Sequence, residues 1–137
     1  MLTNNAYIKY QQMNVETASQ EKLIIMMYEG AIKFIKLAME AIKEKKYDMV
    51  NENIKRTEDI IMELMISLNM DAGEVAKNLY NVYNYLYNRL IEANIKKDTE
   101  ILEEVLKYLM DYKETWEEVF RKVKSGSKNV GKIDLGV

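Results

Sequence analysis

The sequence predicts an all-α protein, folded as an antiparallel up-down four-helix bundle. Four long stretches carry apolar residues at the spacing of an α-helix, and none shows the strict alternation of a half-buried strand. Only a few residues separate one stretch from the next, which makes consecutive helices antiparallel neighbours. The 137 residues include no proline, so nothing in the sequence forces an interruption within a helix.

The first stretch, from Thr17 to about Lys46, is the most apolar of the four. Thr17 or Ser19 is a candidate N-cap. Between residues 23 and 42, five of the seven heptad columns are non-polar. The apolar stripe of an ordinary surface helix covers little more than a third of its circumference, so we expect this helix to be covered on several sides. One apolar column lies at the edge of this arc, and the core does not obviously need it: Ile25, Ile32 and Met39.

The second stretch runs from Asp48, a candidate N-cap, to about Asn69. Its apolar seam follows alternating steps of four and three residues, through Val50, Ile54, Thr57, Ile61, Leu64 and Leu68. Met62 and Ile66 lie off this seam, four residues apart on the polar side. We therefore expect an exposed apolar pair on this helix, and place Met62 and Met39 outside the core.

The third helix is expected to begin at Asp71, with Glu74 at the capping-box position. Its tyrosines 80, 83, 85 and 87 fall on several faces, so they cannot all point into one core. Asp98 is the candidate N-cap of the fourth helix. That helix carries an unbroken heptad seam, formed by Leu102, Val105, Leu109, Tyr112, Trp116, Val119 and Val123.

The two ends differ from the helical stretches. Residues 1–16 are polar but contain Tyr7, Ile8 and Tyr10, and they form either a docking arm or a frayed terminus. Residues 125–137 are rich in glycine and lysine and are expected to form a flexible tail. We thus expect one helical-bundle domain over residues 1–124, with the arm included and the tail outside it.

Composition excludes several classes of function. Lys and Arg number 20 against 22 Asp and Glu, a net charge of −2, which provides no basic field for nucleic acid. Without cysteine or histidine the usual zinc, haem and non-haem iron sites cannot form, and no glycine-rich nucleotide-binding loop is present. No signal peptide or membrane-length apolar run is evident. We expect a cytoplasmic protein that is not an enzyme, uses no cofactor, binds no nucleic acid and does not insert into membranes.

Several motifs, in this order and spacing, resemble the FliS family of flagellar secretion chaperones. They are Tyr10-Gln11-Gln12, Thr17 to Leu23, Met27 to Phe34, Asn78-Leu79-Tyr80 with Tyr83, Arg89-Leu90 with Ala93-Asn94, and Trp116. The resemblance implies a helical bundle that binds the disordered C-terminal segment of flagellin in the cytoplasm. It also implies that flagellin is kept from polymerising early and is delivered to the flagellar export gate.

This function agrees with the surplus of apolar surface, since a disordered amphipathic client can fold into an apolar groove. We expect at least one of the two apolar strips to line that groove. The candidate client-binding residues are Tyr7, Ile8, Tyr10, Ile25, Ile32, Met39, Met62, Ile66, Tyr80 and Tyr87. The alternative is a structural helical-bundle protein that associates with itself through the same surface.

Overall fold

The computed structural model describes residues 17–125, and every regular element in this range is helical. The long helices are α2 (Thr17–Lys43), α3 (Tyr47–Ile66), α4 (Glu74–Lys96) and α5 (Thr99–Lys124), with a short 3-10 helix, η1 (Met70–Ala72), before α4. The prediction of an all-α four-helix bundle is confirmed. The expected arm with Tyr7, Ile8 and Tyr10, and the tail from residue 126, lie outside the described residues.

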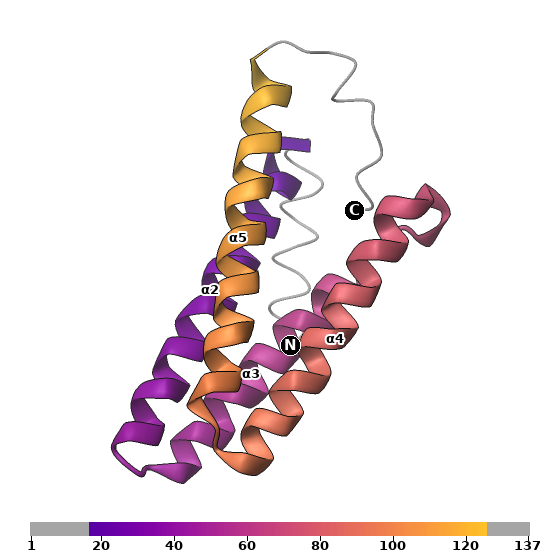
Figure 1. The fold of residues 1–137 in the computed structure, drawn as a ribbon. Helices are drawn as coiled ribbons and strands as arrows, with labels where there is room; N and C mark the ends of the chain where they lie inside the picture. The colour runs from indigo at the N-terminus through magenta and orange to yellow at the C-terminus, as the bar shows by residue number, and fades with distance from the viewer. Residues whose placement is uncertain (1–16, 126–137) are drawn as a thin grey trace, which may run out of the picture.

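The four long helices pack in the cyclic order of the chain. Helix α2 contacts α3 and α5, and α4 also contacts α3 and α5. Figure 1 shows the tight turns α2–α3 and α4–α5 together at one end of the bundle. Toward the other end, the pair α2 and α5 leans away from the pair α3 and α4. The seam between α3 and α4 and the seam between α2 and α5 therefore lie on opposite sides of the bundle.

A close approach between α2 and α3 depends on Gly30. A Cβ atom at this position would lie 3.3 Å from Cδ1 of Ile60, which is tighter than most carbon contacts. Phe34, one turn further along α2, lies beneath the Arg56 guanidinium, with 5.4 Å between the guanidinium carbon and the ring centroid. These contacts fix which side of α2 faces α3.

The core contains most of the residues that the heptad seams predicted, but Tyr112 and Val119 of α5 are only partly buried against it and Val123 does not belong to it. Val50, Ile54, Ile61 and Leu64 of α3 are almost fully buried, as are Leu102, Val105 and Leu109 of α5. Tyr83 is buried, whereas Tyr80 and Tyr85 are exposed, which confirms that the tyrosines of α4 point in several directions.

The interior also holds a polar cluster that periodicity did not indicate. The hydroxyl oxygens of Tyr28 and Tyr83 lie 2.6 Å apart, and Trp116 donates its indole N–H to the Tyr28 hydroxyl across 3.2 Å. This cluster joins α2, α4 and α5. Within residues 17–125, no fully buried side-chain nitrogen or oxygen lacks a hydrogen-bond partner.

The predicted N-caps have different outcomes. Asp98 caps α5 by accepting a 2.9 Å hydrogen bond from the backbone N–H of Glu100, as predicted. Helix α2 begins at Thr17, so Ser19 lies in its first turn and not at its cap. The prediction for Asp48 was wrong, because α3 starts at Tyr47 and Asp48 lies within its first turn.

The prediction that Asp71 caps the third helix was also wrong. Asp71 belongs to η1, where its backbone N–H donates to the side chain of Asn69. Gly73 immediately precedes α4 with a φ of 95°, a conformation that strains any residue with a Cβ atom. The sequence pattern did not indicate η1. This short helix lies in the connection between the end of α3 at Ile66 and the start of α4 at Glu74.

Candidate binding surface

One edge of α3 faces α4 and carries the exposed apolar pair. Lys97, at the end of α4, donates a hydrogen bond to Oδ1 of Asn51 across 2.8 Å, which identifies this edge. Helical spacing places Glu58 two turns further along the same edge, followed by Met62 and Ile66. Met62 is 37% exposed and Ile66 is 70% exposed, so the prediction of an exposed pair is confirmed.

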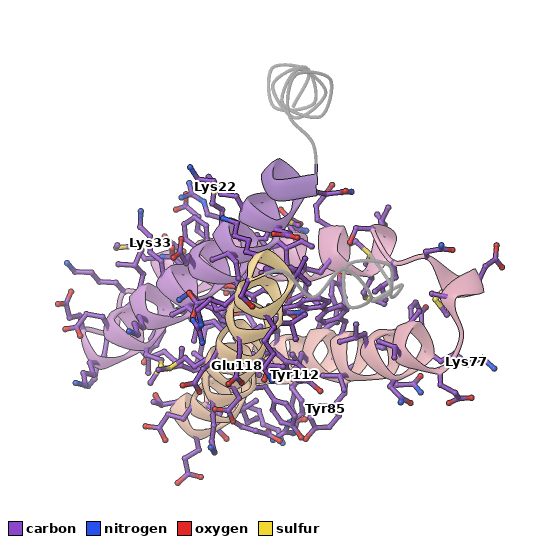
Figure 2. All side chains as sticks on the ribbon, turned by 90° about the horizontal axis from the view of Figure 1, so that it is seen from above. Lys22, Lys33, Lys77, Tyr85, Tyr112 and Glu118 are labelled. Atoms are coloured by element: carbon purple, nitrogen blue, oxygen red, sulfur yellow. The ribbon has the colours of Figure 1, made fainter. Side chains whose placement is uncertain are left out.

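The opposite edges of α4 differ in chemistry. On the side facing α5, the Tyr85 hydroxyl donates to the Glu104 carboxylate across 2.5 Å and its ring packs against Tyr108. Figure 2 shows Tyr85 on the side of α4 next to α5. Tyr80 and Tyr87, seven residues apart, lie together on the edge that faces α3. Tyr80 is 40% exposed, and Tyr87 is half-buried against the core.

We call these two facing edges of the contacting helices α3 and α4 the α3/α4 seam. Its members are Glu58, Met62, Ile66, Tyr80, Tyr87 and Ile91. Sequence reasoning named four of the six and missed Glu58 and Ile91. Ile91 follows Tyr87 by one turn and is 39% exposed, so extending the tyrosine edge by four residues could have found it. Glu58 gave no signal, because a glutamate beside a core position usually lies in solvent.

The other apolar strip, Ile25, Ile32 and Met39, lies on the edge of α2 that faces α5. All three side chains are half-buried and pack against the core. Met39 is not one of the buried core residues, as predicted, but it packs against them because this edge of α2 is turned toward α5. The strip offers less free apolar surface than its heptad column suggested.

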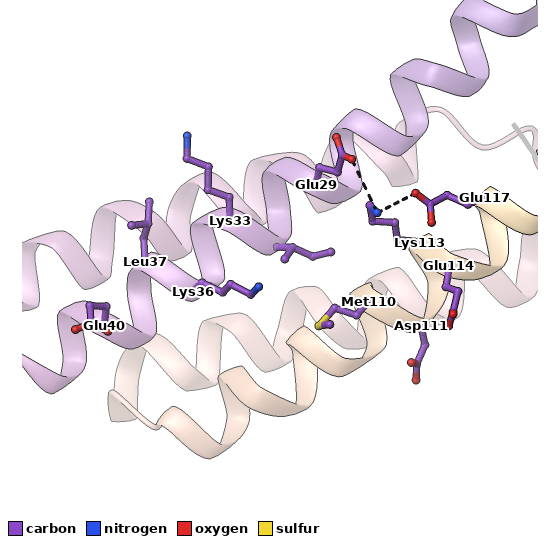
Figure 3. A pocket seen from close by; sticks show the side chains of 11 residues that line it. Glu29, Lys33, Lys36, Leu37, Glu40, Met110, Asp111, Lys113, Glu114 and Glu117 are labelled. Atoms are coloured by element: carbon purple, nitrogen blue, oxygen red, sulfur yellow. Dashed lines mark hydrogen bonds and ion pairs between the residues drawn. The ribbon is translucent and has the colours of Figure 1, made fainter.

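A cavity of about 870 Å³ lies over the contact between α2 and α5. Ile32, Leu37 and Met110 contribute apolar side chains, but most of the lining is charged. Figure 3 shows Lys113 between Glu29 and Glu117, with its ammonium nitrogen 3.9 Å and 2.9 Å from their carboxylate oxygens. Because eight of its eleven lining residues are charged, this cavity suits an apolar client less well than the α3/α4 seam does.

The edge between α4 and α5 is closed by a charged network. Arg89 contacts Glu92 across 2.7 Å and Glu104 across 2.9 Å. The hydrogen bond from Tyr85, followed by that from Arg89, holds the pKa of the Glu104 carboxyl below its usual value. The charged groups of this edge are paired with one another, and the exposed side chains beside them, Tyr85 and Tyr108, are aromatic rings in contact with each other.

Comparison with known proteins identifies the family. The sequence model described as "Flagellar protein FliS" matches residues 3–123. The chain belongs to the FliS family of flagellar proteins. The match spans the four helices and the connections between them.

Named relatives of this FliS-family chain come from several bacteria. It is 38% identical to the flagellar secretion chaperone FliS of Bacillus subtilis, over 95% of this chain and 99% of that protein. Its identity to FliS of Campylobacter jejuni is 33%, over 87% of this chain and 94% of the relative. FliS of Vibrio cholerae is 29% identical over 80% and 85% of the two chains.

Among residues 17–125, no helix is both long and apolar enough to cross a bilayer.

Proposed function

We propose that this FliS-family chain is a cytoplasmic chaperone for flagellin. It binds the disordered C-terminal segment of flagellin, keeps flagellin from polymerising early and delivers it to the flagellar export gate. Family membership supports a role in flagellar secretion, since the named relatives are flagellar secretion chaperones. The observation that carries the binding proposal is the exposed apolar surface of the α3/α4 seam.

The composition of the seam suits an amphipathic client helix. Met62, Ile66 and Tyr80 are each more than a third exposed, although large apolar side chains are usually covered. Burying one such side chain contributes roughly 1.5 to 3 kcal/mol. Two or three contacts of this size offset much of the 2 to 5 kcal/mol, or more, that ordering a disordered segment typically costs.

The proposal extends to the N-terminal arm. Tyr7, Ile8 and Tyr10 supply apolar side chains within a short polar segment. We propose that they cover apolar bundle surface in the free protein and move when flagellin binds. Deleting residues 1–16 is expected to change client affinity, stability or both. If the truncated chain melts and binds as the full chain does, the arm has no such role.

Calorimetric titration with a peptide of the flagellin C-terminal segment tests the seam. We expect Ile66→Glu to weaken binding at least tenfold, because it places a charge where an apolar client side chain should pack. The melting temperature should change little, because Ile66 is 70% exposed. Met26→Glu is the matched control, since Met26 is 49% exposed on the outer face of α2, away from the seam.

For the second apolar strip, on the edge of α2 that faces α5, we expect a different result. Ile32 packs partly against the core, so Ile32→Glu should lower the melting temperature more than Ile66→Glu does. Normal binding by the Ile66→Glu variant would remove the α3/α4 seam from the client site. Weakened binding by a stable Ile32→Glu variant would move the site to the α2/α5 side.

Self-association is the competing use of the same surface. Sedimentation at several protein concentrations, with and without the flagellin peptide, distinguishes the two. A chaperone should form a complex with the peptide, and it should not dimerise through the surface around Ile66. A concentration-dependent dimer that ignores the peptide would favour the structural role.

A further inference from the structure

Glu58 is a largely buried residue whose carboxylate has no partner in the described part of the chain. Its side chain is only 9% exposed, yet no hydrogen bond or ion pair to it occurs among residues 17–125. The carboxylate is not sealed off, because every fully buried side-chain oxygen in this range has a partner. The stem of Glu58 is therefore covered, while its oxygens still open toward the surface.

Other acidic side chains in the bundle show how unusual this is. Glu52, at 58% exposure, accepts a 2.7 Å bond from Arg56, and the more covered Glu104 is held by Arg89 and Tyr85. Removing a carboxylate from water without a partner is costly, so proteins usually pair or hydrogen-bond such groups.

The charged side chains that act on Glu58 do not form an ion pair with its carboxylate. Lys55 and Asp59 act on it from a distance with opposite signs, and neither makes an ion pair with it. Burial is the main reason why the pKa of the Glu58 carboxyl lies above its usual value. The group thus lacks a cation close enough to hold its charge.

Glu58 lies on the α3/α4 seam, one turn before Met62. The bond between Lys97 and Asn51 fixes the antiparallel register of α3 and α4. Two turns along from that bond, Glu58 comes opposite the part of α4 around Leu90 and Ile91. Glu58 is therefore the only charged group among the six members of the seam, and one charged group within a mainly apolar surface is the arrangement that sets the orientation of a bound segment.

We propose that Glu58 is a specificity-determining residue that pairs with a lysine or arginine side chain of the bound client. This inference rests on the proposed function and adds a chemical requirement to it: the client segment must present a cation among the apolar residues that contact the seam. A cation suits the site better than an amide, because a charge-assisted hydrogen bond also neutralises a carboxylate that client binding removes further from water.

Double-mutant cycles provide the test. Binding of the flagellin C-terminal peptide is measured by calorimetry for the native chain and for Glu58→Gln. Each lysine and arginine of the peptide is replaced by glutamine in turn. We expect Glu58→Gln to weaken binding at least tenfold, and to make the replacement of one particular cation harmless. Asp59→Asn is the matched control, because it removes the same charge from the adjacent, exposed position and should bind within twofold of the native chain.

Thermal melts distinguish recognition from a structural role. Glutamine keeps the shape of Glu58 and removes an unpaired charge, so the free variant should melt at the native temperature or above it. A lower melting temperature would assign Glu58 to the stability of the bundle and overturn the proposal. Normal affinity of Glu58→Gln, or lost affinity that couples to no client cation, would overturn it as well. If the native chain does not bind the peptide at all, the proposed function itself fails.

Discussion

At the scale of single residues, the buried cluster of Tyr28, Tyr83 and Trp116 specifies how three helices fit together. The Tyr28 hydroxyl receives the indole N–H of Trp116 and shares a hydrogen bond with Tyr83, and all three side chains are at least 95% buried. Polar groups in a low-dielectric interior are costly when unpaired, so only one relative placement of α2, α4 and α5 satisfies them.

Replacing Tyr28 with phenylalanine should destabilise the protein by about 1 to 3 kcal/mol. The change removes one hydroxyl and leaves the Trp116 N–H and the Tyr83 hydroxyl without their shared partner. Urea unfolding at neutral pH, followed by the fluorescence of the single tryptophan, measures the loss. A variant as stable as the native chain would mean that water or a small shift satisfies both groups.

The same cluster predicts a loss of stability in alkali. Burial, first of all, and the neighbouring Tyr83 raise the pKa of Tyr28 well above its ordinary value, and burial also raises that of Tyr83. The folded state therefore keeps protons that the unfolded chain releases above pH of about 10. Stability contributed in this way is fully present below that pH and falls as the pH rises, by up to about 1.4 kcal/mol per pH unit for each tyrosine.

We expect unfolding curves between pH 9 and about pH 11.5 to lose stability more steeply for the native chain than for Tyr28→Phe. The comparison between the two proteins isolates Tyr28, because every other side chain is present in both. Parallel pH profiles would contradict the prediction.

At the scale of helices, both tight turns at the closed end use a lysine in the left-handed conformation. Lys45 has a φ of 58° after α2, and Lys97 has a φ of 52° after α4. The backbone N–H of Lys46 returns to the carbonyl of Ala41 across 2.9 Å, which closes the first of these turns. Glycine adopts this conformation without the steric cost that a Cβ atom brings.

Lys45→Gly should therefore stabilise the protein by about 0.5 to 1 kcal/mol. Lys45 is exposed, and no side-chain bond to it occurs in the described part of the chain. Lys46→Gly is the control, because its φ of −94° already suits an ordinary residue. Thermal melts should show an increase for the first change and none for the second. A decrease with Lys45→Gly would mean that the flexibility of glycine in the unfolded chain outweighs the relief of strain.

How much the sequence could predict depends on whether a feature is local. The four helices, the α5 cap at Asp98 and the buried seams follow from spacing and side-chain chemistry within one stretch. The contact between Tyr28 and Trp116 joins residues 88 positions apart, and no periodicity can indicate it.

The candidate site follows the same rule. Met62 and Ile66 were recognisable because they lie off their own seam. Whether Ile32 is exposed or packs against the core depended on which side of α2 faces α5. The position of Glu58 depended on the register of α3 against α4.

At the scale of the whole molecule, the core becomes less tightly covered from one end of the bundle to the other. Val50 and Leu102, near the closed end, have no exposed surface. Leu68, Leu79 and Phe120, toward the end where the helix pairs lean apart, are 9%, 8% and 9% exposed. The α3/α4 seam reaches this less covered end through Ile66 and Tyr80. A client bound there would add apolar contacts where these core residues are less covered.

Native-state hydrogen exchange should reveal this gradient. We expect backbone amides of residues 50–57 and 101–109 to exchange only through global unfolding, because these helical segments carry fully buried core residues such as Val50, Ile54 and Val105. Amides of residues 64–80 should exchange faster, through local opening that leaves the closed end intact.

Adding the flagellin peptide should slow exchange in residues 58–80 beyond the general stabilisation that any ligand gives, since client contacts would suppress the local opening itself. Uniform protection along all four helices would mean that the bundle opens as one unit. Peptide protection confined to α2 and α5 would place the client on the opposite side of the molecule.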